Sequence, residues 1–361
     1  MGEELVVKTP GKLMIAGEFA VLEPNQKALV TAVNRFVYTT IETAQENKVS
    51  LPDFSLHALL WKWENEQINF TTKDKRIDFV ANAMETVLGY LKEKQIDLEP
   101  VHLIVKSELA DENGIKYGLG SSAAVVVSVV EAILTRFMSK VPQRSLVFKL
   151  AAIAHVKTQG SGSGADIAAS VYGGLLSYAS FQAEWLLEQL KTVKNVTTLV
   201  EKDWAFLSIE PLPKPDFVQF FVAWTGVAAS TKELVGRMLQ MKVADAKAYA
   251  DFITKSKTAV EEMTTGIQNK DQQLLFSGVT KNRYALKTFG DAANVPLETK
   301  LLSALSECVN VVEGAGKLSG AGGGDCGIAF IPLKQEISQL KDCWCDKGIK
   351  PLDLEMYEHP R

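Results

Sequence analysis

The chain has 361 residues, of which 47% are hydrophobic and 23% are charged. These proportions are ordinary for a folded globular protein, so they exclude a disordered chain, a collagen-like repeat and a small disulfide-held scaffold. Lys and Arg number 39 against 43 Asp and Glu, which gives a formal net charge of −4. That balance argues against nucleic acid or an anionic membrane as a main partner. At about 150 residues per domain, the length predicts one large domain or two closely joined ones.

Hydrophobic spacing predicts an alternation of strands and helices along the whole chain. In the first half we expect strands at 5–7, 13–16, 28–43, 101–107 and 175–180, a hairpin region at 46–72, and helices at 77–94, 122–138, 145–158 and from about 165. In the second half we expect strands at 217–224 and 328–332 and helices at 231–240, 247–269, 271–288 and 297–312. The order predicts the α+β class.

The cysteines and the two chain ends carry little functional signal. Cys308, Cys326, Cys343 and Cys345 form no C-x-x-C pair, and the histidines are scattered, so a zinc enzyme is not indicated. We expect free thiols in a reducing compartment. No basic and then apolar leader and no run of 18 apolar residues is present, so we expect a cytoplasmic protein, a monomer or a homodimer, without a membrane segment.

Three glycine-containing segments are the main functional signal. Residues 10–22 place Lys12 directly after a Pro-Gly pair, and residues 117–124 read Y-G-L-G-S-S-A-A before an expected helix. Helix N-terminal amides favour anions, and Ser121 and Ser122 add hydroxyls for a phosphate or a magnesium ion. The segment lacks the G-K-[ST] of a Walker A loop and the third glycine of the dinucleotide fingerprint.

The third segment, 317–327, contains five glycines in eleven residues. So many glycines cost chain entropy and indicate close approach to a ligand or to another backbone. A shorter element, Q-G-S-G-S-G-A-D at 159–166, places the carboxylate of Asp166 where a loop becomes a helix. Taken alone, that aspartate is equally typical of an ordinary helix N-terminus.

In this order, the segments resemble the three motifs of the GHMP small-molecule kinase family, over almost the whole chain. The resemblance implies a two-lobed fold with the active site between the lobes. The N-terminal lobe, 1–180, would hold ATP in a left-handed β-α-β-type unit, and an α/β C-terminal lobe, 181–361, would hold the acceptor. Further features resemble the phosphomevalonate kinase branch of the family: Phe19 after Gly17-Glu18, Gln159-Gly160, the segments 224–231 and 322–327, and Lys281 to Arg283.

The resemblance also implies an activity and a set of site residues. The activity is transfer of the ATP γ-phosphoryl group to 5-phosphomevalonate, with Mg²⁺ accompanying ATP. Lys12 and Asp166 would be catalytic, and Ser122 would be the metal ligand. The ATP loop would comprise Gly118, Leu119, Gly120, Ser121, Ser122, Ala123 and Ala124. The acceptor would contact Lys12, Ser163, Gly164, Ser230, Thr231, Arg283, Ser319, Ala321 and Gly322.

Two points refine that assignment. Mevalonate kinases carry a magnesium-binding glutamate about eleven residues before the aspartate, and His155 stands there in this chain. We interpret His155 as a packed core residue and assign no carboxylate to the metal. Because a phosphate monoester has a second pKa of about 6, the acceptor is largely dianionic at pH 7 and needs no strong base. Our hypothesis is therefore that Asp166 pairs with and orients Lys12.

Two other functions stay open at the level of sequence. Mevalonate kinase, or another GHMP kinase, is the close enzymatic alternative, and Phe19, His155 and the segment 224–231 argue against it. A non-catalytic ATP-binding sensor is the alternative from another class. The presence of both Lys12 and Asp166 argues against a sensor, because a protein without turnover has no need of them.

Overall fold

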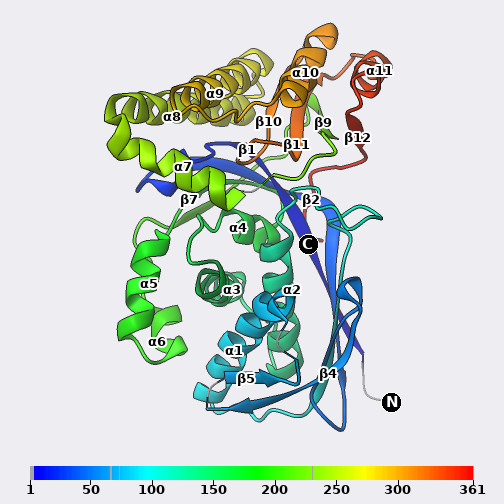
Figure 1. The fold of residues 1–361 in the computed structure, drawn as a ribbon, viewed down its shortest axis with the longest axis vertical. Helices are drawn as coiled ribbons and strands as arrows, with labels where there is room; N and C mark the ends of the chain where they lie inside the picture. The colour runs from blue at the N-terminus through cyan, green and yellow to red at the C-terminus, as the bar shows by residue number, and fades with distance from the viewer. Residues whose placement is uncertain (1–3, 66, 73, 230, 361) are drawn as a thin grey trace.

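The computed structural model describes residues 4–65, 67–72, 74–229 and 231–360. Two lobes are stacked along the long axis of the molecule, each built on its own β-sheet (Figure 1). This arrangement confirms the expected α+β bilobal fold.

Over the residues that the structure describes, the first lobe contains an eight-stranded sheet with six α-helices beside it. Its strands are β1 (Leu5–Ala16), β2 (Lys27–Thr43), β3 (Lys48–Leu51), β4 (Leu56–Glu64), β5 (Gln67–Phe70), β6 (Val101–Ser107), β7 (Leu175–Ala179) and β8 (Ser208–Leu212). Its helices are α1 (Asp78–Glu93), α2 (Ser121–Phe137), α3 (Arg144–Gln159), α4 (Ala165–Tyr172), α5 (Ala183–Thr192) and α6 (Val196–Glu201). The strand order is β5-β4-β3-β6-β2-β7-β8, with β1 paired to β2.

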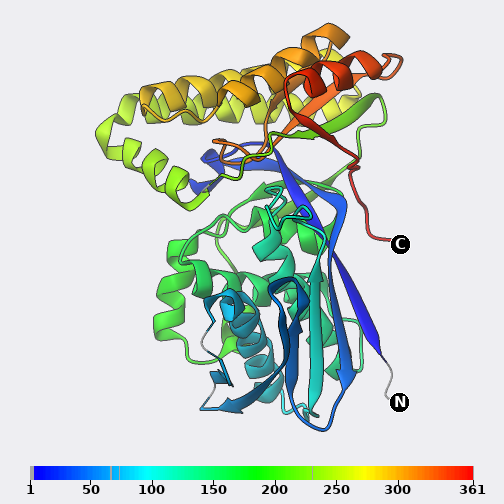
Figure 2. The same cartoon turned by 45° about the vertical axis from the view of Figure 1, so that its right-hand side comes forward.

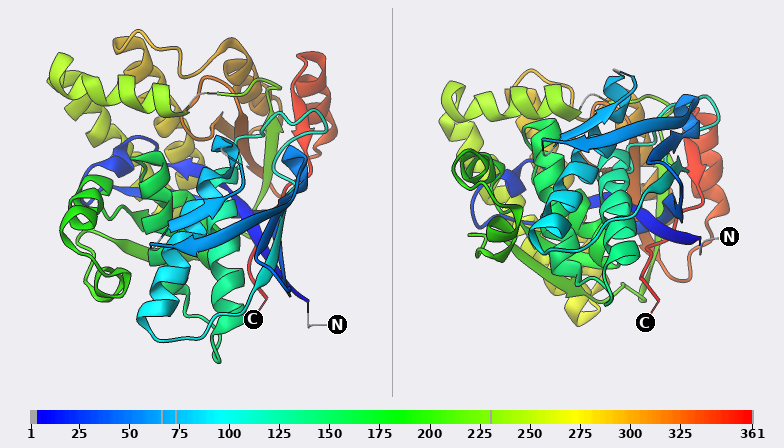
Figure 3. Two further views of the ribbon diagram at one scale, coloured as in Figure 1. Left: turned by 60° about the horizontal axis from the view of Figure 1, so that its bottom comes forward. Right: turned by 90° about the horizontal axis from the view of Figure 1, so that it is seen from below.

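The helices α1 to α4 cover one face of this sheet (Figures 2 and 3). The apolar stretch of α2 lies against the sheet, and Val126, Val130 and Leu134 are fully buried. Burying this face removes several large side chains from water at roughly 25 cal/mol per Å² of apolar area. The long strand β2 pairs in turn with β1, β6 and β7, so it ties the lobe together.

One continuous strand replaces the two short strands expected at 5–7 and 13–16. β1 runs from Leu5 to Ala16 and pairs antiparallel with β2, with a register shift between Pro10 and Gly11. A bulge lets the ladder continue past a proline that cannot donate a hydrogen bond. The bulge lies directly before Lys12, where the strand passes the glycine loop that precedes α2.

The second lobe packs five helices against a four-stranded antiparallel sheet of order β10-β11-β9-β12. Its strands are β9 (Val218–Trp224), β10 (Ala315–Leu318), β11 (Cys326–Pro332) and β12 (Lys350–Leu352). Its helices are α7 (Thr231–Ala244), α8 (Ala246–Asn269), α9 (Gln272–Ala292), α10 (Lys300–Cys308) and α11 (Ser338–Asp346). Helices α8 and α9 form a long hairpin on the outer side of the lobe (Figure 1).

The chain changes from one sheet to the other between Leu212 and Val218, later than the expected boundary at 180. The change comes later because the residues after 180 still belong to the first lobe. There β8 pairs with β7, and α5 and α6 pack beside α3. The C-terminal tail then returns to the first lobe. There Met356 bridges to Val33, and the Tyr357 amide donates to the Ala32 carbonyl at 2.9 Å.

The expectation of four free thiols is wrong for two of them. Cys308 on α10 and Cys343 on α11 form a disulfide, with their Cα atoms 5.8 Å apart. Cys326 is buried and free, and Cys345 is exposed and free. The pairing left no mark in the sequence because 35 residues separate the partners, and only the packing of α10 beside α11 brings them together. In the part of the chain described, no helix has the length and apolar character to cross a membrane.

Candidate active site

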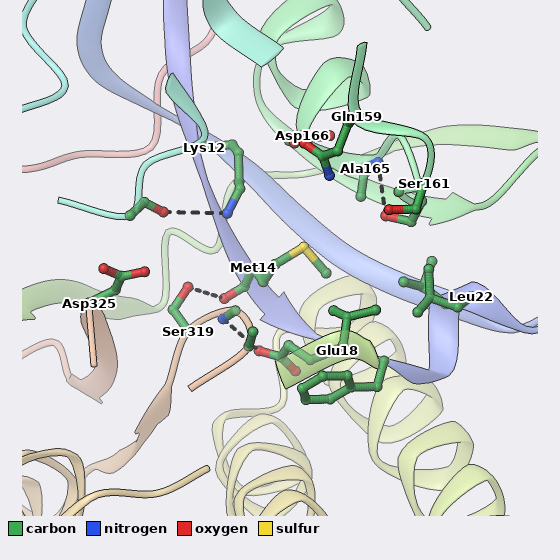
Figure 4. A pocket seen from close by; sticks show the side chains of 18 of the residues that line it. Lys12, Met14, Glu18, Leu22, Gln159, Ser161, Ala165, Asp166, Ser319 and Asp325 are labelled. Carbon is green, nitrogen blue, oxygen red and sulfur yellow. Dashed lines mark hydrogen bonds between the residues drawn. The ribbon is translucent and has the colours of Figure 1, made fainter. Parts of the chain in front are cut away.

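A pocket lies between the lobes where the three glycine-containing segments meet (Figure 4). β1 brings Lys12 and Met14, the turn after β1 brings Glu18, the glycine loop before α2 brings Gly118, and the start of α4 brings Asp166. The third segment closes the other side. Of the site residues expected from the sequence, the pocket is lined by Lys12, Gly118, Ser163, Asp166, Ser319 and Ala321.

Lys12 is held by the glycine loop at both its backbone and its side chain. Its amide donates to the Leu119 carbonyl at 2.9 Å, and its Nζ lies 3.5 Å from the Gly118 carbonyl. The side chain crosses the position where residue 120 lacks a Cβ, because a Cβ built on Gly120 would be 2.9 Å from Lys12 Cγ. A larger residue at 120 would therefore displace the lysine.

The loop before α2 and the start of the helix offer backbone N–H groups that can bind an anion. Gly118 and Gly120 have φ of 83° and 72°, the left-handed region that glycine enters without penalty. No side chain caps the N-terminus of α2, so its first amides and the positive end of the helix dipole are available to a phosphate. Ser121 and Ser122 begin the helix. Ala123 and Ala124 are fully buried, so they can act only by packing and through their backbone.

His155 is buried beneath this helix start, as the sequence interpretation expects of a packed residue. It is 2% exposed, and its Nε2 lies 3.3 Å from Ser122 Oγ. Burial lowers the pKa of His155, and the charge of Asp166 offsets only part of that effect. The ring is therefore neutral at pH 7, and it can orient the Ser122 hydroxyl without adding charge.

Asp166 lies in the first turn of α4, and its side chain lies on the same side of Gly120 as that of Lys12. The two side chains converge there, since a Cβ on Gly120 would be 3.1 Å from Lys12 Cε and 3.5 Å from Asp166 Cβ. Among the described residues, however, no ion pair within 4 Å joins Lys12 to Asp166 (Figure 4). The pairing expected from the sequence therefore stays a prediction.

Tyr178 and Phe181 hold the loop that leads into α4. The Ser163 carbonyl accepts from the Tyr178 hydroxyl at 2.5 Å, and its Oγ accepts from the Ala165 amide at 3.3 Å. A Cβ on Gly164 would lie 2.5 Å from Phe181, so only glycine fits there. Gly164 therefore shapes the loop, whereas Ser163 faces the pocket.

The third segment contributes Ser319 and Ala321 to the pocket, and its glycines shape the loop. Ser319 Oγ donates to the Met14 carbonyl at 2.8 Å, which joins this segment to β1. Gly322 packs against the backbone of Leu297 and does not line the pocket. Asp325, which the sequence did not single out as a site residue, lines the pocket opposite Asp166 (Figure 4).

A buried ion pair beside the pocket was also missed by sequence reasoning. Lys317 Nζ lies 2.5 Å from Glu18 Oε1, with side chains 0% and 2% exposed. Burial lowers the pKa of Lys317, and Glu18 opposes that shift. Glu18 Oε1 also accepts from the Gly320 amide at 3.4 Å, while Glu18 Oε2 has no partner among the described residues. Both residues belong to recognised motifs, but no spacing rule links positions 299 residues apart.

Arg283 is not brought to the pocket. Its guanidinium makes a two-pronged contact with Glu298, at 2.8 and 2.7 Å, and the Glu298 side chain is 1% exposed. Burial would raise the pKa of Glu298, but the Arg283 hydrogen bonds more than offset it, so that pKa lies below its usual value. Ser230 lies outside the described residues, and so does the side chain of Thr231, the residue that begins α7.

Within the described ranges, no group of three or more His, Cys, Asp or Glu side chains could hold a metal ion. The donors around the loop are instead a hydroxyl, on Ser122, and a carboxylate, on Asp166. Oxygen donors of this kind suit Mg²⁺, which keeps several waters and commonly binds proteins through few side chains together with substrate phosphates.

Comparison with known proteins points to one family. Residues 78–174 match the model "GHMP kinases N terminal domain", and residues 283–350 match "GHMP kinases C terminal". A phosphomevalonate kinase of Streptomyces sp. (strain CL190) is 31% identical, over 98% of this chain and 97% of that protein.

Two solved structures are also similar to this chain over nearly its full length. A Lin0012 protein from Listeria innocua is 37% identical and superposes with a TM-score of 0.91, covering 99% of this chain and 100% of that one. Streptococcus pneumoniae phosphomevalonate kinase in complex with phosphomevalonate and AMPPNP is 28% identical, with a TM-score of 0.85 and coverage of 98% and 100%.

The Glu18–Lys317 pair yields a stability prediction. Replacing Lys317 by Met leaves the Glu18 carboxylate buried without its counter-charge, so we expect a loss of about 3–5 kcal/mol in the free energy of unfolding. The double variant Glu18→Gln with Lys317→Met removes both charges and should lose clearly less. Urea unfolding of the two variants beside the unmodified chain measures the difference. A loss below about 1 kcal/mol in Lys317→Met would show that the pair contributes little.

Proposed function

The chain belongs to the GHMP kinase family, and we propose that it is a phosphomevalonate kinase, which transfers the γ-phosphoryl group of ATP to 5-phosphomevalonate to give 5-diphosphomevalonate and ADP. The observation that carries the proposal is the convergence of Lys12, the glycine loop before α2 and Asp166 in one pocket between the lobes. The names of the Streptomyces and Streptococcus relatives support the choice of acceptor. A cytoplasmic location, and a monomer or homodimer, stay predictions of the sequence.

The glycine loop and α2 form the nucleotide side of the site in this proposal. The backbone amides of 118–124 and the uncapped α2 N-terminus would hold the phosphates of MgATP. Mg²⁺, when bound with the nucleotide, would supply positive charge that neutralises the phosphates. Ser122 Oγ, oriented by the neutral ring of His155, would be its protein ligand.

The acceptor side is formed by residues from both lobes. Lys12 would lie between the acceptor phosphate and the γ-phosphate, where a fixed cation neutralises charge that builds up during transfer. Ser163 and Ser319 offer polar groups, and Ala321 leaves room beside them. Ser230 and Thr231 stay predictions for this side. Gly164 and Gly322 support the site by shaping its loops.

Asp166 is proposed to orient Lys12, because the acceptor is already an anion at pH 7. A bare carboxylate would repel a phosphate dianion. Beside Gly120 and near Lys12, it would instead give the lysine a neighbouring opposite charge. The argument for this role rests on the charge of the acceptor.

A direct assay tests the function. We expect the purified chain to release ADP from ATP with phosphomevalonate, at a kcat/KM at least about 100-fold above that with mevalonate, because Lys12 and the adjacent polar groups are matched to a phosphate. A coupled assay with both acceptors side by side gives the ratio. Faster turnover of mevalonate would assign the mevalonate kinase activity instead. Binding of ATP without turnover of either acceptor would indicate a sensor.

The roles of Lys12 and Asp166 are separable by kinetics. Lys12→Met should lower kcat by about 10³-fold, because it removes the cation that stabilises the transferring group. Asp166→Asn should lower kcat by only about 10-fold, and the acidic limb of the pH–rate profile should persist. Steady-state assays from pH 5 to 9 measure both. Equal losses in the two variants, with the acidic limb abolished in Asp166→Asn, would instead make Asp166 a general base.

Substitution of Arg283 should lower stability and leave catalysis almost unchanged, the reverse of what we expect for Lys12. Arg283→Leu leaves the buried Glu298 carboxylate unpaired, so we expect a loss of about 3 kcal/mol in stability. Because Arg283 does not line the pocket, the KM for phosphomevalonate should stay within about twofold. Thermal unfolding and steady-state kinetics on the same preparation give both numbers. An unchanged melting temperature with a KM raised more than about tenfold would return Arg283 to the acceptor site.

A further inference from the structure

Asp325 occupies a backbone conformation in which glycine would be the easier residue. It lies at the end of the third glycine segment, directly before β11, with φ of 57°. Gly320, Gly322 and Gly323 in the same segment also have positive φ. The left-handed region is disfavoured for residues that carry a Cβ. The contacts of the Asp325 side chain therefore have to explain why an aspartate, and not a glycine, stands at this position.

The first set of contacts closes the turn at 225–229. The Asp325 amide donates to the Val227 carbonyl at 2.7 Å, and the Asp325 carbonyl accepts from the amide and the hydroxyl of Thr225, both at 3.0 Å. The carboxylate itself accepts from the Ala229 amide at 3.2 Å. Glycine could reproduce the backbone bonds but not this last one, which fixes the end of the turn just before α7.

The second contact is with the glycine loop that precedes α2. A Cβ on Gly118 would lie 2.5 Å from Asp325 Cγ and 2.7 Å from Oδ2, so the carboxyl group packs directly on the loop backbone. The next residue, Cys326, donates its thiol to the Tyr117 carbonyl at 3.1 Å. Two neighbouring side chains, one directly before β11 and one at its start, thus support the loop from the side of the second lobe.

The carboxylate also faces Lys12. Figure 4 shows Lys12 with Asp166 on one side and Asp325 on the other. Burial raises the pKa of Asp325, and the Ala229 amide and the charge of Lys12 act against that rise. Among the described residues, Asp325 and Lys12 make no ion pair within 4 Å, so the hydrogen bond to Ala229 and the packing on Gly118 are the direct contacts of the carboxyl group.

We propose that Asp325 is a positioning residue, whose side chain fixes the turn at 225–229 against the glycine loop at 117–120 and so sets the separation between the acceptor side and the nucleotide side of the pocket. The acceptor named in this inference rests on the proposed function. In-line phosphoryl transfer is sensitive to that separation, because a displacement of about 1 Å can cost about 100-fold in rate.

Two substitutions separate the contribution of the Asp325 side chain from that of its backbone conformation. Asp325→Asn keeps an oxygen for the Ala229 amide, keeps the volume over Gly118 and tolerates the left-handed conformation. Asp325→Gly removes the side chain while it relieves the backbone. We expect Asn to keep kcat within about threefold and Gly to lower kcat about 30-fold or more, with both KM values within about threefold. Asp325→Ser, which lacks the carboxyl group but keeps the Cβ, should fall between them.

The unfolding midpoint of each variant and its calorimetric affinity for AMPPNP show that the fold and the nucleotide site persist. Asp325→Gly as active as the unmodified chain would overturn the proposal, because the side chain would then do nothing that glycine cannot do. Asp325→Asn as impaired as Asp325→Gly would also overturn it, in favour of charge toward Lys12. The comparison uses whichever acceptor the unmodified chain phosphorylates. A failure to use phosphomevalonate would therefore count against the proposed function alone.

Discussion

The buried ion pair between Glu18 and Lys317 is the contact on which the geometry of the site depends. It joins the end of β1 to the end of β10, and these strands belong to different sheets. Two charges withdrawn from water are tolerable only while they stay together, so the pair fixes one relative position of the lobes at this point. Ser319, bonded to the Met14 carbonyl, repeats the connection beside it. Lys12 lies on the same strand, so its placement relative to the third segment follows from this junction.

Charge in the pocket is balanced locally and bears no relation to the net charge of −4. Three carboxylates, on Glu18, Asp166 and Asp325, line a pocket meant for polyanions. Glu18 is neutralised by Lys317, and the other two flank Lys12. In the proposed reaction, phosphates would therefore meet backbone amides, a helix N-terminus and Lys12, while the carboxylates contact other groups of the protein. Such an arrangement would let a slightly acidic protein accept two strongly acidic substrates.

The sequence predicted the fold and part of the pocket, because both depend on local signals. Long periodic segments became α1, α2, α3, α8 and α9, whereas α5, α6 and α11 are short and were not foreseen. The glycine motifs located Lys12, Gly118 and Asp166, since a motif fixes residue types at set spacings. Arg283, expected at the acceptor site by the same reasoning, does not line the pocket, because a family motif does not say whether a nearby carboxylate such as Glu298 pairs with the guanidinium. The Cys308–Cys343 bridge and the Glu18–Lys317 pair needed the tertiary structure.

The return of the C-terminal tail to the first lobe limits how the lobes can move. The chain leaves the first lobe once, between Leu212 and Val218, and comes back once, after Leu352, to the bridge between Val33 and Met356. The first lobe therefore holds both ends of the chain segment that forms the second lobe. Separating the lobes would break the Val33–Met356 bridge as well as the Glu18–Lys317 ion pair, which lie at different places on the molecule.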